Sequence, residues 1–177
     1  ADKMYASIPA EERQRLESKY LGKDFAIDNE LSIKYNPDEF KRIVLIYLEA
    51  IRFAASIYND IIKNCGRPVD FEMSVDETLT PTTPESHCFV ASELIAGGVD
   101  ITSLAPRFCG EFQKGIDYIG DLDRFTAEFD MHARIAGKLG YKISVHSGSD
   151  KFSVFPVIGE KTRGRYHLKT AGTNWLE

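Results

Sequence analysis

Apolar residues recur with a helical period over a long stretch in the first half of the chain. From Phe40 to Ile62 they fall every three or four positions, which places them on one face of a helix. Asn36 followed by Pro37 is typical of a helix start, and Gly66 is typical of a helix end. The pattern therefore predicts a helix that begins after Asn36 and ends before Gly66.

The residues before this helix predict weaker elements. A short polar helix is expected over residues 7–20, and Gly22 follows its end. A weak strand is expected over Glu30–Lys34. Residues 1–68 are therefore interpreted as an N-terminal segment of helices with one weak strand.

From residue 69 onward, extended apolar runs alternate with helical patterns. Strands are expected at Val69–Val75, Ile101–Ala105, Lys142–His146 and Arg165–Thr170. Helices are expected from Thr83 to Ala96 and over Leu122–Leu139, with Gly140 as a C-cap and a loop or short helix at Ser149–Ile158. Strands that alternate with helices indicate βαβ units, a parallel sheet and the α/β class.

A doubly wound sheet and a (β/α)8 barrel both fit this alternation. The chain contains neither GxGxxG nor GxxxxGK[ST], so dinucleotide or P-loop binding has no support. Polar and acidic residues instead follow several strands, where barrel enzymes hold their chemistry. A TIM barrel takes about 250 residues. We therefore expect 177 residues to form a single α/β domain or part of a TIM-barrel-like fold, with residues 69–177 carrying the site.

Composition excludes several classes of partner. With 27 acidic and 22 basic residues the net charge is −5, which argues against nucleic acid. No apolar run approaches the roughly 20 residues that cross a bilayer. Cys65, Cys88 and Cys109 do not have zinc-ribbon spacing, and we expect three reduced, buried thiols in a cytoplasmic protein.

Side chains alternate between the two faces of a strand, and this parity gathers polar groups. The polar sets that share a face are Asp70, Glu72, Ser74 and Asp76; then Lys142, Ser144 and His146; then His167, Lys169 and Ala171. If the opposite, apolar face packs on helices, the polar sets converge on the barrel axis.

Two imidazoles with one or two carboxylates at neighbouring strand ends predict a divalent-metal site. Neutral His nitrogen and carboxylate oxygen suit Zn, Mn, Fe, Co or Ni. The competing interpretation is that these groups are solvated strand ends or core polar groups bonded to their neighbours. Spacing alone leaves the two interpretations about even.

Cationic side chains in or beside the same loops are candidates for holding an anionic substrate: Arg107, Lys114, Lys151 and Lys169. The alternative is a solvated surface charge, which fits Lys151 better than Arg107. His87 and His132 fall inside expected helices and are interpreted as structural or surface residues.

Four segments closely resemble the bacterial tagaturonate epimerase family: FEMSVDETLTPTTPESH, SLAPRFCGEFQKGIDYIGD, KISVHSGSDKFSVFP and HLKTAGTNWLE. They cover most of residues 69–177, and the earlier part, with YLGKDF, is similar less specifically. The resemblance implies a metal-dependent sugar-acid epimerase with a TIM-barrel-like fold that interconverts D-tagaturonate and D-fructuronate. Members of the family are much longer, so we expect this chain to be an internal or truncated portion.

The resemblance, combined with strand-face parity, suggests roles for the candidate residues. Glu72 is expected to be the general acid–base, His146 and His167 metal ligands, and Asp76 a further ligand or an orienting group. Arg107, Lys114 and Lys169 are expected to bind the substrate. The two sugar acids differ at a carbon two bonds from the ketone, so retro-aldol cleavage, rotation of the aldehyde and re-addition is one route.

Two other functions remain open. One is a metal-dependent sugar-acid isomerase or aldolase, because the same groups serve any enediolate chemistry. The other is a non-catalytic fragment that binds a sugar acid. A half barrel leaves two sheet edges unpaired, so self-association is expected. The expected partner is a small keto-sugar acid, with no nucleic acid and no membrane.

Overall fold

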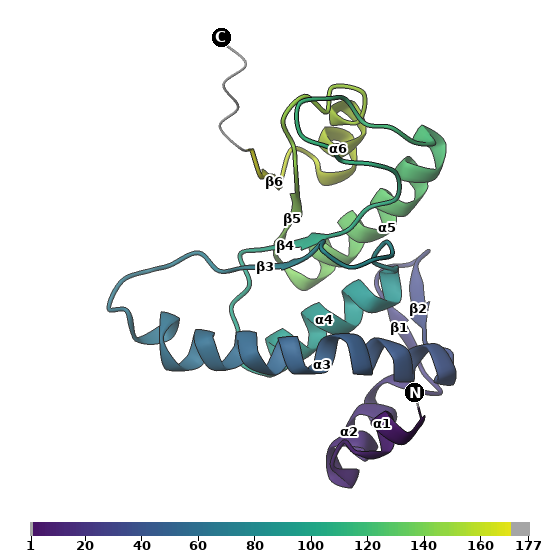
Figure 1. Ribbon diagram of the computed structural model, residues 1–177, viewed down its shortest axis with the longest axis vertical. Coiled ribbons are helices and arrows are strands. Elements are labelled where there is room, and N and C mark those ends of the chain that lie inside the picture. Colours follow the sequence, from purple (N-terminus) through teal and green to yellow (C-terminus); the bar gives the residue numbers. More distant parts are fainter. Residues whose placement is uncertain (1, 171–177) are drawn as a thin grey trace. The chain divides into compact units, whose positions relative to one another are not determined.

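The computed structural model describes residues 2–170, which form two compact units (Figure 1). The first unit contains the described residues up to Val69 together with Glu85–Asp100. The second contains Asp70–Pro84 together with the described residues from Ile101 onward. The end of the segment HLKTAGTNWLE, including Ala171, lies outside the described residues.

The first unit is mainly helical. Its elements are α1 (Asp2–Ala6), α2 (Ala10–Tyr20), β1 (Asp24–Ala26), β2 (Ser32–Lys34), α3 (Pro37–Asp60), a 3-10 turn (Ile62–Asn64) and α4 (Pro84–Ala96). The helix expected over residues 7–20 is confirmed as α2, which begins directly after Pro9, whereas α1 was not predicted. The expected weak strand is confirmed as β2, which pairs antiparallel with the unpredicted β1.

Helix α3 follows the sequence pattern closely. The Asn36 side chain accepts hydrogen bonds from the backbone N–H groups of Asp38 and Glu39, so it is the N-cap. The apolar face of α3 is buried, and Phe40 contributes to a cluster of aromatic rings in the core of this unit: Tyr20, Phe25, Tyr35, Phe40 and Phe89.

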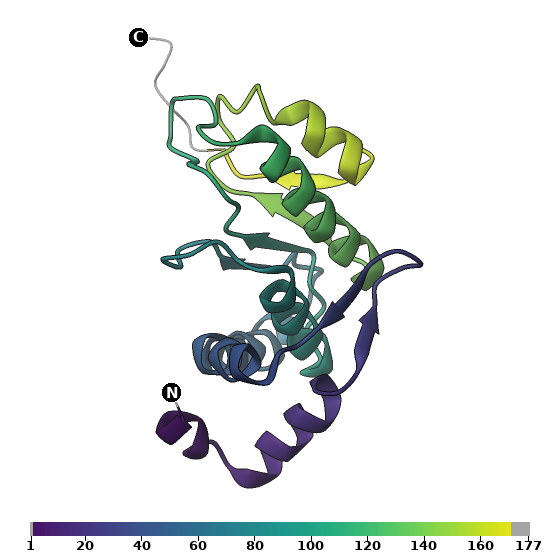
Figure 2. The same cartoon turned by 90° about the vertical axis from the view of Figure 1, so that its right-hand side faces the viewer.

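The second unit is built on a parallel sheet. Within the described residues its strands are β3 (Glu72–Val75), β4 (Ser103–Pro106), β5 (Lys142–Val145) and β6 (Tyr166–Leu168), and they lie side by side in chain order. The α/β class is therefore confirmed, whereas the described residues do not close a barrel. Helices α5 (Leu122–Leu139) and α6 (Phe155–Thr162) pack on each other and along β5 and β6 (Figure 2).

Helix α5 has the predicted bounds because both of its ends carry strong local signals. The Asp121 carboxylate accepts a hydrogen bond from the backbone N–H of Arg124, which caps the first turn. At the other end Gly140 has a φ of 91°, a left-handed conformation that glycine adopts without strain. The buried face of α5, which includes Phe125, Phe129 and Ile135, packs against the sheet through β5.

The sheet curls toward its polar face. Adjacent strands lie about 4.8 Å apart, so a flat sheet would hold β3 and β6 about 14 Å from each other. Side chains from these two strands nevertheless meet, because Glu72 lies 2.7 Å from His167, and Ser74 lies 2.7 Å from Lys169, the residue directly after β6. Because the sheet curves toward its polar face, the polar side chains of its strands lie close to one another.

The expectation of three buried cysteines is confirmed for two of them and wrong for the third. Cys88 and Cys109 are buried, but Cys65 is exposed because it follows the end of α3 in a turn. None of the helices in the described part of the chain is both long and apolar enough to cross a membrane.

Candidate functional site

Glu72, the first residue of the edge strand β3, binds several side chains of the polar face of the sheet. Its Oε2 accepts hydrogen bonds from Ser103 Oγ at 2.5 Å and from His167 Nδ1 at 2.7 Å. Ser144 Oγ lies 3.3 Å from the same His167 nitrogen. Burial alone would raise the pKa of Glu72. The hydrogen bonds from Ser103, His167 and Ser144 and the charge of Lys169 outweigh burial, so the pKa is lowered and the carboxylate is ionised at neutral pH.

Lys169 joins the two carboxylates of this face. Its Nζ lies 3.4 Å from Glu72 Oε1 and 3.9 Å from Asp76 Oδ2, and it donates a hydrogen bond to Ser74 Oγ. The predicted parity is therefore confirmed, since Glu72, Ser74 and Asp76 all face residues of the last two strands or their ends. Glu72 and His167, however, lie within their strands rather than at the carboxyl ends.

His146 and Asp76 form a second pair, beyond the ends of β5 and β3. His146 Nδ1 lies 3.8 Å from Asp76 Oδ2, and both side chains are largely buried. Burial lowers the pKa of His146 more than the Asp76 carboxylate raises it, so the imidazole is neutral at pH 7. His146 Nε2 is buried, and no group among the described residues forms a hydrogen bond with it.

The Asp76–His146 pair lines two adjoining cavities. One, of about 410 Å³, is lined by Asp76, Arg107, Phe108, Gly110, Glu111, Phe112, Gln113 and His146. The other, of about 260 Å³, is lined by Asp76, Lys114, His146, Ser147, Ser149, Lys169 and Thr170. The first volume falls in the range of small-molecule sites. Neither lining includes Glu72 or His167. Lys169 lines the smaller cavity and also lies 3.4 Å from Glu72.

The predicted substrate-binding cations reach these cavities from different elements. Arg107 follows β4 and donates one guanidinium N–H to the carbonyl oxygen of Thr78. Its backbone N–H donates to the Thr82 hydroxyl, and its carbonyl oxygen accepts from the Thr82 backbone N–H. Lys114 is exposed at the rim of the smaller cavity. Lys169 is bound to the carboxylates and is the least available of the three for a substrate.

Sequence reasoning placed one cation incorrectly. Lys151 was expected to be a solvated surface charge, but its side chain is fully buried and its Nζ donates hydrogen bonds to three backbone carbonyls. The interpretation of His132 as structural is consistent with its environment, because complete burial lowers its pKa to about 4.

Ser103 was missed as a site residue. It occupies the same strand face as two apolar neighbours, Ile101 and Ala105, which hid its role. Its role follows from its register opposite Glu72 in the adjacent strand, which only the structure shows.

The predicted metal ligands are not gathered around one position. Within residues 2–170, no three His, Cys, Asp or Glu side chains are arranged to hold one cation. His167 is bonded to Glu72, and the ammonium of Lys169 lies beside both carboxylates. His146 does fit a ligand, since it is neutral and its buried Nε2 lacks a described partner. The described residues therefore offer part of a metal site, His146 through Nε2 with Asp76 facing its other ring nitrogen, and do not complete one.

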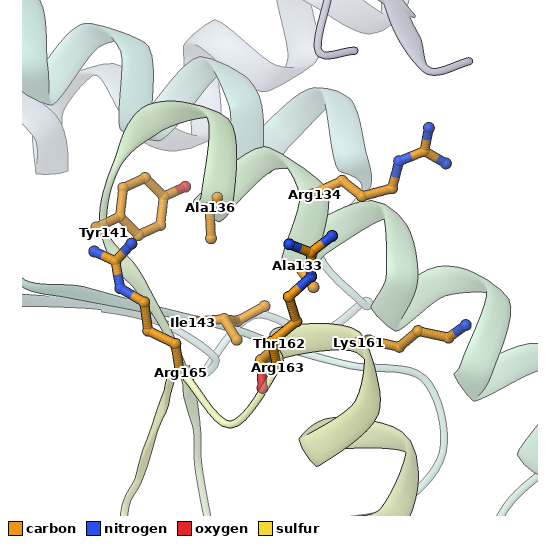
Figure 3. A pocket seen from close by; sticks show the side chains of 10 residues that line it. Ala133, Arg134, Ala136, Tyr141, Ile143, Lys161, Thr162, Arg163 and Arg165 are labelled. Carbon is orange, nitrogen blue, oxygen red and sulfur yellow. The ribbon is translucent and has the colours of Figure 1, made fainter. Parts of the chain in front are cut away.

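A further pocket lies at the opposite end of the strands, between the ends of α5 and α6 (Figure 3). It has a volume of about 460 Å³ and contains none of the predicted site residues. Three of its four cations are engaged: Arg134 and Lys161 pair with Asp130, and Arg165 donates to the carbonyl oxygen of Gly140, which leaves Arg163. We therefore place the functional site on the polar face of the sheet.

Comparisons with known proteins point to one family. The profile of the tagaturonate epimerase family matches residues 1–177. A tagaturonate/fructuronate epimerase of Thermotoga maritima is 48% identical over 166 residues, which cover 93% of this chain and 34% of that protein. The native crystal structure of fructuronate-tagaturonate epimerase UxaE from Cohnella laeviribosi is 55% identical with a TM-score of 0.95, and a glycerol complex of it has a TM-score of 0.94. Each match covers 99% of this chain and 36% of the solved chain, so this chain spans about a third of the length of its relatives.

Proposed function

Because this chain belongs to the tagaturonate epimerase family, we propose that the complete protein interconverts D-tagaturonate and D-fructuronate, and that the polar face of the sheet is part of its active site. The observation that supports this most directly is the convergence of Glu72, Asp76, His146, His167 and Lys169, which come from three separate strands and their ends. The curvature of the sheet brings these side chains together beside the cavities.

The reaction inverts one hydroxyl-bearing carbon two bonds from a ketone. Removing a proton from the carbon next to the ketone does not invert that centre. Cleavage of the bond between the hydroxyl-bearing carbon and the carbon next to the ketone allows the inversion. The hydroxyl loses its proton, and an aldehyde and an enolate form. The aldehyde rotates, and the bond forms again on its other face. The proton then returns to the new alkoxide, so atoms and charge balance.

Glu72 is the proposed group for this proton transfer. It is ionised, it is held by Ser103 and His167, and it is only partly exposed. A positioned carboxylate of this kind accelerates proton transfer by about 10²–10⁴-fold. The ammonium of Lys169, 3.4 Å away, compensates the charge of Glu72 and adds positive potential where an enolate oxygen develops.

Arg107 and Lys114 are proposed to receive the substrate carboxylate. They line the two cavities that share Asp76 and His146, so an anion held between them places the rest of the sugar chain near this pair. The remaining N–H groups of Arg107 can grip a carboxylate with two hydrogen bonds.

A divalent metal ion remains part of the proposal for the complete protein, with Zn, Mn, Fe, Co and Ni as candidates. His146 would hold it through Nε2, Asp76 would be a further ligand or would orient the imidazole from the Nδ1 side, and further ligands would come from outside residues 2–170. When bound, such an ion supplies polarisation of the ketone. We also propose a cytoplasmic location, which suits the buried thiols of Cys88 and Cys109.

The proposal is tested by incubating the full-length gene product with D-tagaturonate and following D-fructuronate by NMR, with and without a chelator. We expect conversion in both directions and its loss on chelation. A folded protein that converts neither sugar acid would overturn the epimerase proposal. Formation of a different keto or aldehyde product would identify a sugar-acid isomerase or aldolase instead.

A further inference from the structure

Lys151 is a buried cation held entirely by backbone oxygens. Its side chain has no exposed surface, and Nζ donates to the carbonyl oxygens of Gln113 at 2.6 Å, Ile116 at 2.6 Å and Ser149 at 3.0 Å. An ammonium group has three N–H donors, so these three carbonyls use all of them.

The three carbonyls belong to two different loops. Gln113 and Ile116 lie in the loop between β4 and α5, residues 107–121, while Ser149 lies in the loop between β5 and α6, residues 146–154. Lys151 itself is in the second loop. The bonds from Nζ to the first loop therefore cross between loops that are separated by the whole of α5.

Both loops line the cavities of the candidate site. Gln113 belongs to the larger cavity and Ser149 to the smaller one, and the adjoining residues Arg107, Lys114 and His146 line the same spaces. Lys151 does not line either cavity. Two of its three contacts, with Gln113 and Ser149, are with the backbone of residues that do, so it acts on the site through them.

A second contact joins the same loops on the surface. The Asp117 carboxylate accepts hydrogen bonds from the backbone N–H and the hydroxyl of Ser153. This exposed contact contributes less than the buried one, because solvent competes for both partners. Removing the Lys151 ammonium would take the donor from three partly buried carbonyls at once.

We propose that Lys151 is a positioning residue that joins the loops 107–121 and 146–154 into one frame for the substrate cavity. The inference rests on the proposed function in so far as the cavity binds the sugar acid. Loosening the frame separates Arg107 and Lys114 from His146, so substrate binding weakens more than proton transfer at Glu72, which is held by the strands.

The test compares three variants of the full-length protein: Lys151→Met, Asp117→Ala, and Lys138→Met as the control at an exposed position of α5. Hydrogen exchange without substrate is measured first. We expect faster exchange confined to residues 107–121 and 146–154 in Lys151→Met, a smaller increase in Asp117→Ala, and no change in Lys138→Met. Exchange in both loops that stays at the wild-type rate would overturn the proposal.

Kinetics supply the second readout. We expect KM to rise at least 10-fold in Lys151→Met while kcat changes less than 3-fold, with a smaller rise in Asp117→Ala. A 10-fold fall in kcat with an unchanged KM would contradict the positioning role. If Lys151→Met does not fold, Asp117→Ala decides by the same criteria. Hydrogen exchange tests the joining of the loops without any activity, so its failure is distinguishable from failure of the epimerase proposal.

Discussion

Lys169 contributes to the charge state of the residues around it. Its ammonium lies near the carboxylates of both Glu72 and Asp76, which reduces the repulsion between them. It also contributes to the lowered pKa of Glu72 and, as a like charge, to that of His146. At neutral pH the face therefore holds an ionised Glu72 beside a neutral His146. A base and a potential metal ligand are available in the same pH range.

The buried Nε2 of His146 leads to a prediction about metal content. His146→Ala in the full-length protein is expected to lower bound divalent metal from near one equivalent to less than 0.1, because the neutral imidazole is lost and Asp76 alone binds weakly. Inductively coupled plasma mass spectrometry after dialysis measures the content. His167→Ala is the informative comparison, since His167 is bonded to Glu72. Unchanged metal in His146→Ala would remove His146 from the ligand set.

At the scale of elements, Glu93 holds two helices of the first unit together. It projects from α4 and is almost fully buried, and its carboxylate accepts hydrogen bonds from Arg15, Lys19 and Tyr20 of α2, each at 2.7 Å. Burial alone would raise the pKa of Glu93, but these three partners lower it below the ordinary value. The ionised carboxylate therefore stabilises the folded state.

This contact predicts a pH-dependent change in stability. A lowered pKa contributes stability above the pKa of the unfolded chain, and the contribution is lost as the pH falls through the folded pKa. Glu93→Gln is expected to lower the free energy of unfolding by about 2 kcal/mol at pH 7 and by less at acid pH. Urea unfolding of the full-length protein measures the change. Glu49→Gln, at an exposed ion pair, is the control and should change stability by less than about 0.5 kcal/mol. An equal loss at both pH values would contradict the electrostatic explanation.

Elements with strong local signals could be predicted from the sequence, and those without could not. Helix α5 has the expected bounds because Asp121 and Gly140 fix its ends. Strand β1 was missed because three residues carry too little pattern, and its pairing with β2 supplies the stabilisation. The side chains that share the polar face followed from parity alone. The hydrogen-bond partners of these side chains could not be predicted in this way, since the hydrogen bond between Glu72 and His167 depends on the curvature of the whole sheet.

Lys151 marks the limit of reasoning from residue type. Lysine is almost never fully buried, so a lysine in a polar loop is expected to be solvated. Its burial depends on three carbonyls, two of them more than 30 residues away in the chain. The residues next to Lys151 in the sequence do not predict these contacts.

At the scale of the whole molecule, the chain matches only part of the length of its relatives. It spans about a third of the length of its relatives, and its described sheet has unpaired edges at β3 and β6. Further strands of the complete protein, or a second copy, would cover these edges. The polar face described above is therefore one side of the proposed active site, and it contains the proposed acid–base Glu72.

The most direct test of the account is the conversion of D-tagaturonate by the full-length protein and by its Glu72→Gln variant, followed by NMR. Glu77→Gln, at an exposed carboxylate close in the sequence, is the matched control. We expect wild-type conversion in the control and a fall in kcat of about 10³-fold in Glu72→Gln, because the amide cannot accept the hydroxyl proton. Circular dichroism should show the same fold in all three proteins. Wild-type turnover by a folded Glu72→Gln variant would contradict the assignment of the reaction to this face of the sheet.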